Sequence, residues 1–402
     1  MPKIVLFNLG TQAANAAAAI NVTEAGLTSR AVVSDLTLAG KSVQRVGGMC
    51  VDKSGNIYVS DEEQHVIMKI NESGEIGTFA GLAGTAGNNS ALQGVASASA
   101  RFNQPRGLAC DNSGNIYVAD YGNNQIRMIR NGKVDVFAGN GAQTAGLVDS
   151  TSDPMQARFS HPSDVAVDNS GVVYVADTDN HAIRKIWGGQ VLTIAGGGSA
   201  TDASNVRASN LIPFCSSPIG IAVDANGTIY VCDTGNNIIK KIVSRGWVYR
   251  HSGSGIAGNS LGASSTEPAY ACTYNGPTYI AVDSYGYQYV TDVTSSGSRL
   301  VKLTPNGVPS NIIDFATAST SDSGVVGVAV SPAAKVFVSI ATASEYVSSS
   351  SSSSVDSSSS SSSVDSSSSS SSSEGNSSSS SSSSLGESSS SSSLGESSSS
   401  SS

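Results

Sequence analysis

One eight-residue phrase recurs along the chain and limits what it can fold into. Its clearest copies are "SGNIYVSD" (54–61), "SGNIYVAD" (113–120), "SGVVYVAD" (170–177) and "NGTIYVCD" (226–233). The aspartates that end these copies, together with Asp292 in a more degraded copy, are separated by 59, 57, 56 and 59 residues. A sustained period of this length predicts one supersecondary unit per repeat, with neighbouring units packed against each other.

Each repeat reads as four strands. In "PRGLACDNSGNIYVADYGNNQIRMIRNGKVDVFAG" (105–139), short apolar segments alternate with turn sequences rich in Gly, Asn and Asp. Small residues such as Ala119 and Ala176 stand beside Ile and Val, which fits a sheet covered on both faces. The unit is therefore predicted to be a four-stranded antiparallel blade of a β-propeller, in an all-β chain.

The two ends of the repeat region predict how the ring closes. A sixth, fainter copy begins with "VVGVAVSPAAKVFVSI" (325–340) and continues to "SEYV" (344–347). This copy supplies three strands and lacks a fourth. Upstream, "VSDLTLAG" (33–40) is similar to the fourth-strand sequences "VDVFAG" and "VLTIAG". An N-terminal strand is thus expected to complete the last blade of a six-bladed ring, which removes exposed sheet edges.

The repeats resemble those of the NHL-repeat family of β-propellers. The resemblance rests on "ARFNQPRGLACD" (100–111), "ARFSHPSDVAVD" (157–168), "DTDNHAIRKI" (177–186) and "DTGNNIIKKI" (233–242). It covers residues 30–347, the predicted six-bladed propeller. Outside it lie a predicted N-terminal arm (1–29), which the repeat does not explain, and a serine-rich tail (348–402). The fold alone implies no function, because propellers include enzymes, ligand-binding proteins and scaffolds.

Paired aspartates nine residues apart recur in five repeats. A catalytic site needs one asymmetric constellation, whereas five equal pairs indicate architecture. We expect these carboxylates to accept hydrogen bonds from backbone amides at turns and strand ends. The pairs are Asp52 and Asp61, Asp111 and Asp120, Asp168 and Asp177, Asp224 and Asp233, and Asp283 and Asp292.

The histidines are candidates for metal ligands. The resemblance implies this alternative, since some NHL-type lyases hold zinc through histidines and related six-bladed lactonases hold a divalent ion. The four histidines are His65, His161, His181 and His251, and no HxH or HExxH spacing joins them. No catalytic residue, metal or cofactor is predicted, and a metal-dependent lactonase or lyase is kept as the alternative.

The connections between blades are long, at 82–104, 140–161, 197–217 and 254–276, and rich in small, uncharged residues. In a propeller they emerge on one face, where binding sites commonly lie. Two interpretations stay open: these segments contact carbohydrate or neighbouring subunits, or they pack over the blade edges.

Charge and cysteine content exclude several classes. With 22 basic against 31 acidic residues and a net charge of −9, the chain is not expected to bind nucleic acid. The N-terminus has neither the apolar length of a membrane span nor the pattern of a Sec signal peptide. The five cysteines are too scattered for a disulfide scaffold, and buried thiols are expected.

The tail determines the functional hypothesis. From 348 to 402 nearly every residue is serine, interrupted by "VD" and "LGE", and these runs resemble tracts of virion appendage proteins of tailed bacteriophages. The chain is interpreted as a non-enzymatic structural or recognition subunit of a phage virion fibre, with a cell-surface NHL glycoprotein or filament subunit as an alternative. Its predicted place is extracellular or on a virion, and its predicted partners are other copies of itself, other appendage subunits or carbohydrate. Candidate glycosylation sites are Asn21, Asn71, Asn88, Asn226 and Asn376.

Overall fold

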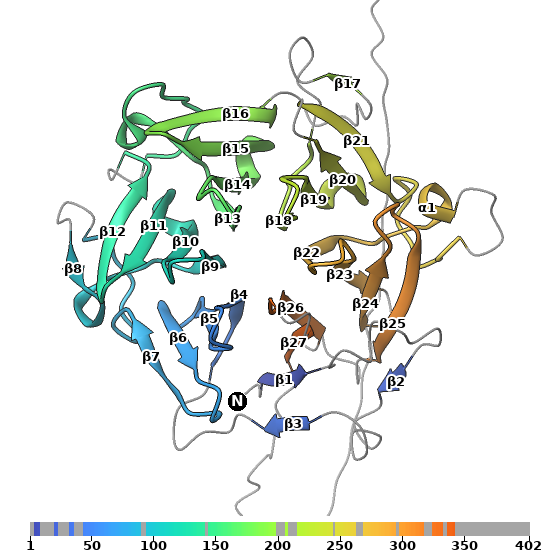
Figure 1. Cartoon of the computed structure of the whole chain (residues 1–402), viewed down its shortest axis with the longest axis horizontal. Helices are drawn as coiled ribbons and strands as arrows, with labels where there is room; N and C mark the ends of the chain where they lie inside the picture. Colours follow the sequence, from blue (N-terminus) through green and yellow to red (C-terminus); the bar gives the residue numbers. More distant parts are fainter. Residues whose placement is uncertain are drawn as a thin grey trace, which may run out of the picture. The chain divides into compact units, whose positions relative to one another are not determined.

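Six sheets, each with four antiparallel blade strands, are arranged around a central axis in the computed structural model (Figure 1). The structure describes residues 4–8, 20–22, 32–35, 43–89, 94–140, 144–197, 206–207, 215–243, 246–262, 268–294, 297–316, 324–332 and 336–341. These sheets are the blades of a six-bladed β-propeller, as the period predicts. They belong to one compact unit, Met1–Tyr346, while Val347–Ser402 forms a second unit that lies outside the described residues.

Blades 1 to 5 succeed one another along the chain. Within each blade the first strand lies nearest the axis and the fourth lies outermost (Figure 1). Blade 1 contains β4 (Val46–Val51), β5 (Ile57–Asp61), β6 (Val66–Ile70) and β7 (Ile76–Ala80). Blade 2 contains β9 (Pro105–Cys110), β10 (Ile116–Asp120), β11 (Gln125–Arg130) and β12 (Lys133–Ala138). Blade 3 contains β13 (Pro162–Val167), β14 (Val173–Asp177), β15 (Ala182–Trp187) and β16 (Gln190–Gly196).

Blades 4 and 5 repeat the pattern. Blade 4 contains β18 (Ile221–Val223), β19 (Ile229–Asp233), β20 (Ile238–Ile242) and β21 (Trp247–Ser252). Blade 5 contains β22 (Pro277–Val282), β23 (Gln288–Thr294), β24 (Gly297–Leu303) and β25 (Pro309–Ala316). A short 3-10 turn joins the second and third strands in blades 2, 3 and 4, at Tyr121–Asn123, Thr178–Asn180 and Thr234–Asn236.

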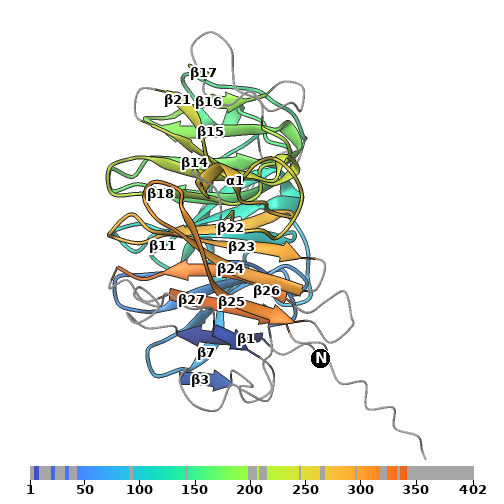
Figure 2. The same ribbon diagram turned by 90° about the vertical axis from the view of Figure 1, so that its right-hand side faces the viewer.

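Blade 6 is built from both ends of the propeller sequence (Figures 1 and 2). Its strand order is β26 (Gly324–Val330), β27 (Val336–Ala341), β1 (Ile4–Asn8) and β3 (Val32–Asp35). The closing N-terminal strand is therefore confirmed for 33–35, within β3, while the rest of the predicted segment 33–40 lies outside the described residues. Closure pairs five of the six residues of β27, because Ile4 to Asn8 stand opposite Ala341 to Phe337.

Two details of the predicted closure differ. The third strand of blade 6 is β1, whereas the sequence suggested a C-terminal strand near 344–347, which lies outside the described residues. In addition, β2 (Ile20–Val22) pairs in parallel with β25 of blade 5. Two described segments of the predicted arm (1–29), 4–8 and 20–22, thus complete hydrogen-bond ladders that the repeats leave open.

The long connections pack partly over the outer edges of the blades. A strand β8 (Val95–Ala96) pairs with β12, and β17 (Val206–Arg207) pairs with β21. The phenylalanines of the two "ARF" sequences, Phe102 and Phe159, are fully buried in the clusters between blades. A 3-10 turn at Ser97–Ser99, another at Pro154–Gln156 and the short helix α1 (Pro268–Ala271) complete these segments.

Candidate functional site

The first aspartate of each pair organises the turn after an innermost strand. Asp111 accepts hydrogen bonds from the backbone N–H groups of Ser113 (2.8 Å) and Asn115 (2.9 Å), and from the Tyr117 hydroxyl (3.4 Å). The same three bonds recur at Asp52, Asp168, Asp224 and Asp283. Burial, reinforced by the nearby carboxylate, raises the pKa of Tyr117 to about 12.

The second aspartate of each pair ties its strand end to the segment that enters the same blade. Asp120 accepts from the backbone N–H of Asn103 at 2.8 Å, and each equivalent carboxylate accepts from the residue seventeen positions before it. The other carboxylates of this set are Asp61, Asp177, Asp233 and Asp292. All five are buried, which makes an uncompensated negative charge costly.

A buried cation seven residues later compensates that charge in four blades. Arg184 Nη1 lies 2.7 Å from Asp177 Oδ2, and both side chains are fully buried. The other ion pairs are Arg127 with Asp120, Lys240 with Asp233, and Arg299 with Asp292. Blade 1 has Met68 at this position, and Asp61 instead accepts hydrogen bonds from four backbone N–H groups, those of Gln44, Arg45, Glu63 and Gln64.

Two histidines form hydrogen bonds between neighbouring blades. His181 adopts a left-handed backbone conformation (φ 52°), and its Nδ1 accepts the backbone N–H of Ser217 at 2.9 Å. His65 does the same with Gln104 at 3.1 Å. Asn124 and Asn237 occupy the equivalent corners and accept from His161 and Gly276 through their side-chain oxygens. The recurrence of His at this position therefore has an architectural explanation.

The remaining two histidines do not occupy corner positions. His161 Nδ1 contacts Asp179 Oδ2 at 2.5 Å, while His251 is buried and its Nε2 lies 2.8 Å from Gln288 Oε1. Burial lowers the pKa of His251 to about 4. Across the part of the chain that the structure describes, no three His, Cys, Asp or Glu side chains are grouped in a way that could hold a metal ion.

One catalytic signature escaped the sequence reasoning: "GNSLG" (258–262) has the form G-x-S-x-G. A hydrolase nucleophile of this kind stands on a sharp turn between a strand and a helix. Ser260 instead lies in the connection after β21, where its backbone N–H donates to Thr273 Oγ1 and its Oγ accepts from the backbone N–H of Gly262. The local structure does not supply the nucleophile elbow.

Two cysteines form a disulfide, which corrects the expectation of buried thiols. Cys50 and Cys110 belong to the innermost strands of blades 1 and 2, and their Cα atoms are 6.0 Å apart. They are 60 residues apart in sequence, about one repeat, and only the packing of neighbouring blades brings them together. Cys215, Cys232 and Cys272 are buried free thiols, and burial raises the pKa of Cys232.

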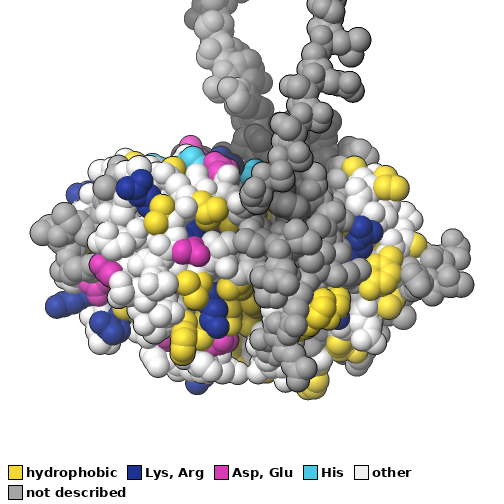
Figure 3. Space-filling view, turned by 90° about the horizontal axis from the view of Figure 1, so that it is seen from above, with side chains coloured by type: hydrophobic (Ala, Val, Ile, Leu, Met, Phe, Trp, Pro, Cys, Tyr) yellow, Lys and Arg dark blue, Asp and Glu magenta, His cyan; other side chains and the backbone are white. Residues whose placement is uncertain are grey.

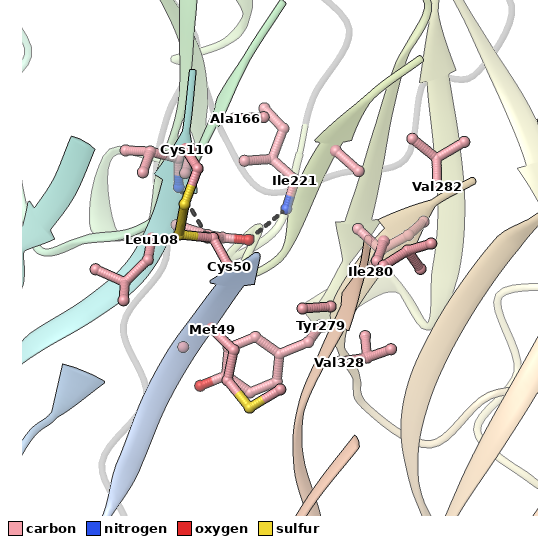
Figure 4. Close-up of a pocket in the computed structure, with 18 of the residues that line it drawn as sticks. Met49, Cys50, Leu108, Cys110, Ala166, Ile221, Tyr279, Ile280, Val282 and Val328 are labelled. Carbon is pink, nitrogen blue, oxygen red and sulfur yellow. Dashed lines mark hydrogen bonds between the residues drawn. A yellow bond between two sulfur atoms is a disulfide. The ribbon is translucent and has the colours of Figure 1, made fainter. Parts of the chain in front are cut away.

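A cavity of about 180 Å³ lies among the innermost strands of all six blades (Figure 4). Its walls are mostly Val, Ile and Ala, with the Cys50–Cys110 disulfide on the side of β4 and β9. Two polar side chains, Asp164 and Tyr279, also line it. Each replaces the glycine that the repeat has at this position in other blades, namely Gly48, Gly107, Gly220 and Gly327.

The carboxylate of Asp164 is held by two backbone groups. It accepts the N–H of Val165 at 2.8 Å and the N–H of Ile221, in the next blade, at 2.9 Å. Burial raises the pKa of Asp164 to about 7, and among the described residues no cationic side chain forms an ion pair with it. In blade 5 the Tyr279 hydroxyl donates to the carbonyl of Gly47 at 2.8 Å.

The face from which the blade connections emerge carries both apolar and charged side chains. Leu82, Leu147, Val148 and Ile256 are exposed on three of these connections, Ile256 to 69%. A row of contacts joins blades 1 and 2 at the same face. Glu62 forms ion pairs with Arg45 and Arg106, and the Arg106 guanidinium lies over the ring of Tyr121. Figure 3 shows histidine, acidic and basic side chains gathered along one edge of the propeller.

The predicted glycosylation sites lie in different environments. Asn226 is exposed in the turn between β18 and β19. Asn71 and Asn88 are half-buried and make side-chain hydrogen bonds, to Glu75 and Gln125 respectively. Asn21 lies in β2, and Asn376 lies outside the described residues. Of the helices that the structure describes, none combines the length and the apolar character that crossing a bilayer requires.

The NHL repeat family matches this chain at residues 102–127, 159–186 and 216–242, which lie in blades 2, 3 and 4. Teneurin-3 of Danio rerio is 27% identical over 308 residues, covering 66% of this chain and 11% of the relative. NHL repeat-containing protein 2 of Homo sapiens is 27% identical over 218 residues, covering 48% of this chain and 29% of the relative. Protein SUPPRESSOR OF QUENCHING 1, chloroplastic, of Arabidopsis thaliana is 28% identical over 166 residues, covering 38% of this chain and 15% of the relative. The match thus spans less than a third of each of these proteins.

Solved structures with a similar fold include two enzymes. Virginiamycin B lyase from Staphylococcus aureus has a TM-score of 0.45 and 15% sequence identity, with 78% of this chain and 86% of the lyase covered. A gluconolactonase from Xanthomonas campestris has a TM-score of 0.47 and 13% identity, with 74% and 86% covered. The six sheets themselves, and not these likenesses, establish the architecture of this chain.

Proposed function

We propose that this chain, which contains NHL repeats folded as a six-bladed propeller, is a non-catalytic structural subunit outside the cytoplasm that associates with other copies of itself. The observation that carries the proposal is the recurrence of exposed aliphatic side chains at Leu82, Leu147, Val148 and Ile256. Because each follows the outermost strand of a blade, the repeat places them at the same face. Apolar side chains interspersed with charges of both signs are typical of protein interfaces.

The repeated carboxylates favour a structural role over a catalytic one. Their hydrogen bonds and ion pairs connect strands within a blade, and the corner residues His65, Asn124, His181 and Asn237 connect neighbouring blades. These contacts join strands and blades to one another, which favours a structural role. The serine-rich segment 348–402 stays a predicted stalk, and its assignment to a virion fibre or a cell-surface filament stays a prediction.

Association is tested by sedimentation velocity on the full chain across a hundredfold concentration range. We expect concentration-dependent oligomers that Leu147→Glu and Ile256→Glu weaken, because each buries a charge in the interface. Tyr285→Glu is the matched control, since Tyr285 is 73% exposed but lies in a turn at the other face. A monomer at every concentration would contradict self-association, and binding on a glycan array would then favour the carbohydrate alternative.

The compartment is supported by the Cys50–Cys110 bond, because disulfides persist in oxidising environments outside the cytoplasm. Protein purified from its native source under non-reducing conditions, alkylated and digested, is expected to yield a cross-linked peptide pair containing these two cysteines. Cys215, Cys232 and Cys272 serve as internal controls and are expected to be alkylated only after denaturation. Alkylated Cys50 and Cys110 in the native protein would contradict the extracytoplasmic assignment.

The alternative function is a lactonase or lyase. The propeller enzymes that suggest it hold a divalent metal ion, so this alternative predicts a bound ion. Metal analysis of the purified full chain distinguishes the two functions. A stoichiometric ion retained through gel filtration would favour the enzyme and count against the structural proposal.

A further inference from the structure

The innermost strands follow one sequence pattern, and two blades break it at the same position. Blades 1, 2, 4 and 6 place Gly48, Gly107, Gly220 and Gly327 there, whereas blade 3 has Asp164 and blade 5 has Tyr279. In a repeat protein the shared residues build the scaffold, so departures from the repeat distinguish one blade from another. Both departures line the same cavity, which makes an otherwise pseudo-symmetric space asymmetric.

Asp164 is an unusual carboxylate for this protein. The strand-end aspartates of blades 2 to 5 each have a buried Arg or Lys beside them. Asp164 is 7% exposed and accepts two backbone hydrogen bonds, but no described cation forms an ion pair with it. A buried carboxylate in its charged form is stabilised by a positive partner. The raised pKa of Asp164, near 7, is consistent with a charge that the described residues leave uncompensated.

The surroundings of this carboxylate define what a partner must look like. The cavity of about 180 Å³ is similar in size to an engineered cavity of about 150 Å³ that binds benzene. Its walls include Val165, Ile221 and Ile280, which favour an apolar body. The aromatic ring of Tyr279 adds a surface that attracts organic cations. A metal ion would need several oxygen ligands, and Asp164 is the only carboxylate among the residues that line the cavity.

We propose that the central cavity is a binding site for a small organic cation, an alkylammonium group whose charge pairs with Asp164 and whose apolar part contacts Tyr279 and the aliphatic walls. The site is independent of the proposed self-association, because it lies at the axis and the exposed aliphatic side chains lie on the connections.

The glycine at this position in the preceding blade explains how the carboxylate is accommodated. A Cβ atom on Gly107 would come within 1.9 Å of Asp164 Oδ1, so the Asp164 side chain occupies the space above the glycine backbone of blade 2. Asp164 therefore also contributes to packing between blades. A test must separate that structural contribution from binding.

The probe is n-butylammonium chloride, titrated into the full chain and followed by isothermal titration calorimetry, with n-butanol as the neutral isostere and calcium chloride as the metal. We expect saturable binding of n-butylammonium, at least tenfold weaker binding of n-butanol, and no stoichiometric binding of calcium. Two variants remove the charge: Asp164→Asn keeps the shape, and Asp164→Gly restores the residue that blades 2 and 4 have at this position. Both are expected to weaken n-butylammonium binding at least tenfold, and unfolding curves show whether each is folded.

Asp179→Asn is the matched control, because it removes an exposed carboxylate of the same blade outside the cavity and is expected to leave binding unchanged. Three results would overturn the proposal: no saturable binding of n-butylammonium, equal binding of n-butanol, or undiminished binding by a folded Asp164→Gly protein. Stoichiometric calcium binding lost in Asp164→Asn would overturn it as well, in favour of a metal site.

Discussion

At the residue scale, the buried aspartates show how the same side chain is stabilised in different ways. Asp177 has Arg184 beside it, Asp61 has four backbone N–H groups, and Asp164 has two. Burial raises the pKa of all three, because desolvation disfavours the charged form. The nature of the compensating partner therefore decides what each substitution does.

Replacing Arg184 by Met leaves Asp177 buried without its cation. We expect Arg184→Met to lower the free energy of unfolding by about 3–5 kcal/mol, measured by urea denaturation, because removal of one partner leaves an uncompensated buried charge. Lys185→Met, at the neighbouring and less buried position, is expected to change stability by about 0.5 kcal/mol or less. Equal effects of the two substitutions would show that the ion pair does not stabilise the blade.

Asp164 makes stability depend on pH. Burial raises its pKa from the ordinary value of 3.8 to about 7 in the folded protein, so between these values the folded state binds more protons than the unfolded chain. Its contribution to stability is therefore fully present below about pH 4 and is lost as the pH rises through 7.

The charge is absent in Asp164→Asn, so its stability should fall less between pH 5 and pH 8 than that of the wild type. Urea unfolding at both pH values measures this difference. Asp177 and Asp292, whose pKa values burial raises to about 6, are present in both proteins and cancel in the comparison. Parallel pH profiles would contradict a raised pKa for Asp164.

At the scale of elements, the corner between the second and third strands determines how blades join. The residue at the corner has a positive φ and offers a side-chain acceptor to the next blade, as Asn124 and His181 do. Asn suits both demands, because it tolerates the left-handed region better than most residues. His meets the second demand through Nδ1.

Two substitutions of His181 test whether the corner needs a hydrogen-bond acceptor or the imidazole ring itself. We expect His181→Asn to keep stability within about 0.5 kcal/mol, because Asn performs this role in blades 2 and 4. His181→Ala should cost about 1–3 kcal/mol, since it leaves the N–H of Ser217 without its acceptor and places alanine, which tolerates the left-handed region poorly, at φ 52°. Thermal unfolding measures both, and equal losses would argue against the proposed corner bond.

At the scale of the whole propeller, closure depends on strands from the N-terminus. β1 pairs with β27 on one side and with β3 on the other, so the last blade has four strands only when both ends of the propeller sequence are present. An open ring would expose the edge of β27, and exposed edges promote aggregation. The N-terminal strands are therefore expected to stabilise every blade through the ring.

Deletion of residues 1–35 removes β1, β2 and β3. We expect the truncated protein to lose its single cooperative thermal transition and to aggregate, as followed by calorimetry and light scattering. A chain ending at residue 346 is the control, because 347–402 belongs to the second compact unit, and it should keep the transition. A soluble, cooperatively folding deletion variant would show that closure is dispensable.

The sequence by itself determined the blade, the period and the number of blades. Local patterns suffice for these, because alternating apolar residues and Asx–Gly turns fix a four-stranded unit and repetition fixes the ring. The NHL repeats were likewise recognisable from their motifs alone.

Only the tertiary structure decided which residues meet across blades. The Cys50–Cys110 bond, the place of β1 and the shared cavity of Asp164 and Tyr279 all depend on contacts between segments that local periodicity does not relate. The sequence shows that Asp164 and Tyr279 replace the glycine of the other repeats. Only the structure shows that both side chains line the central cavity. The physical reason is that a repeat specifies its own fold locally, whereas a site requires side chains from several repeats to converge in space.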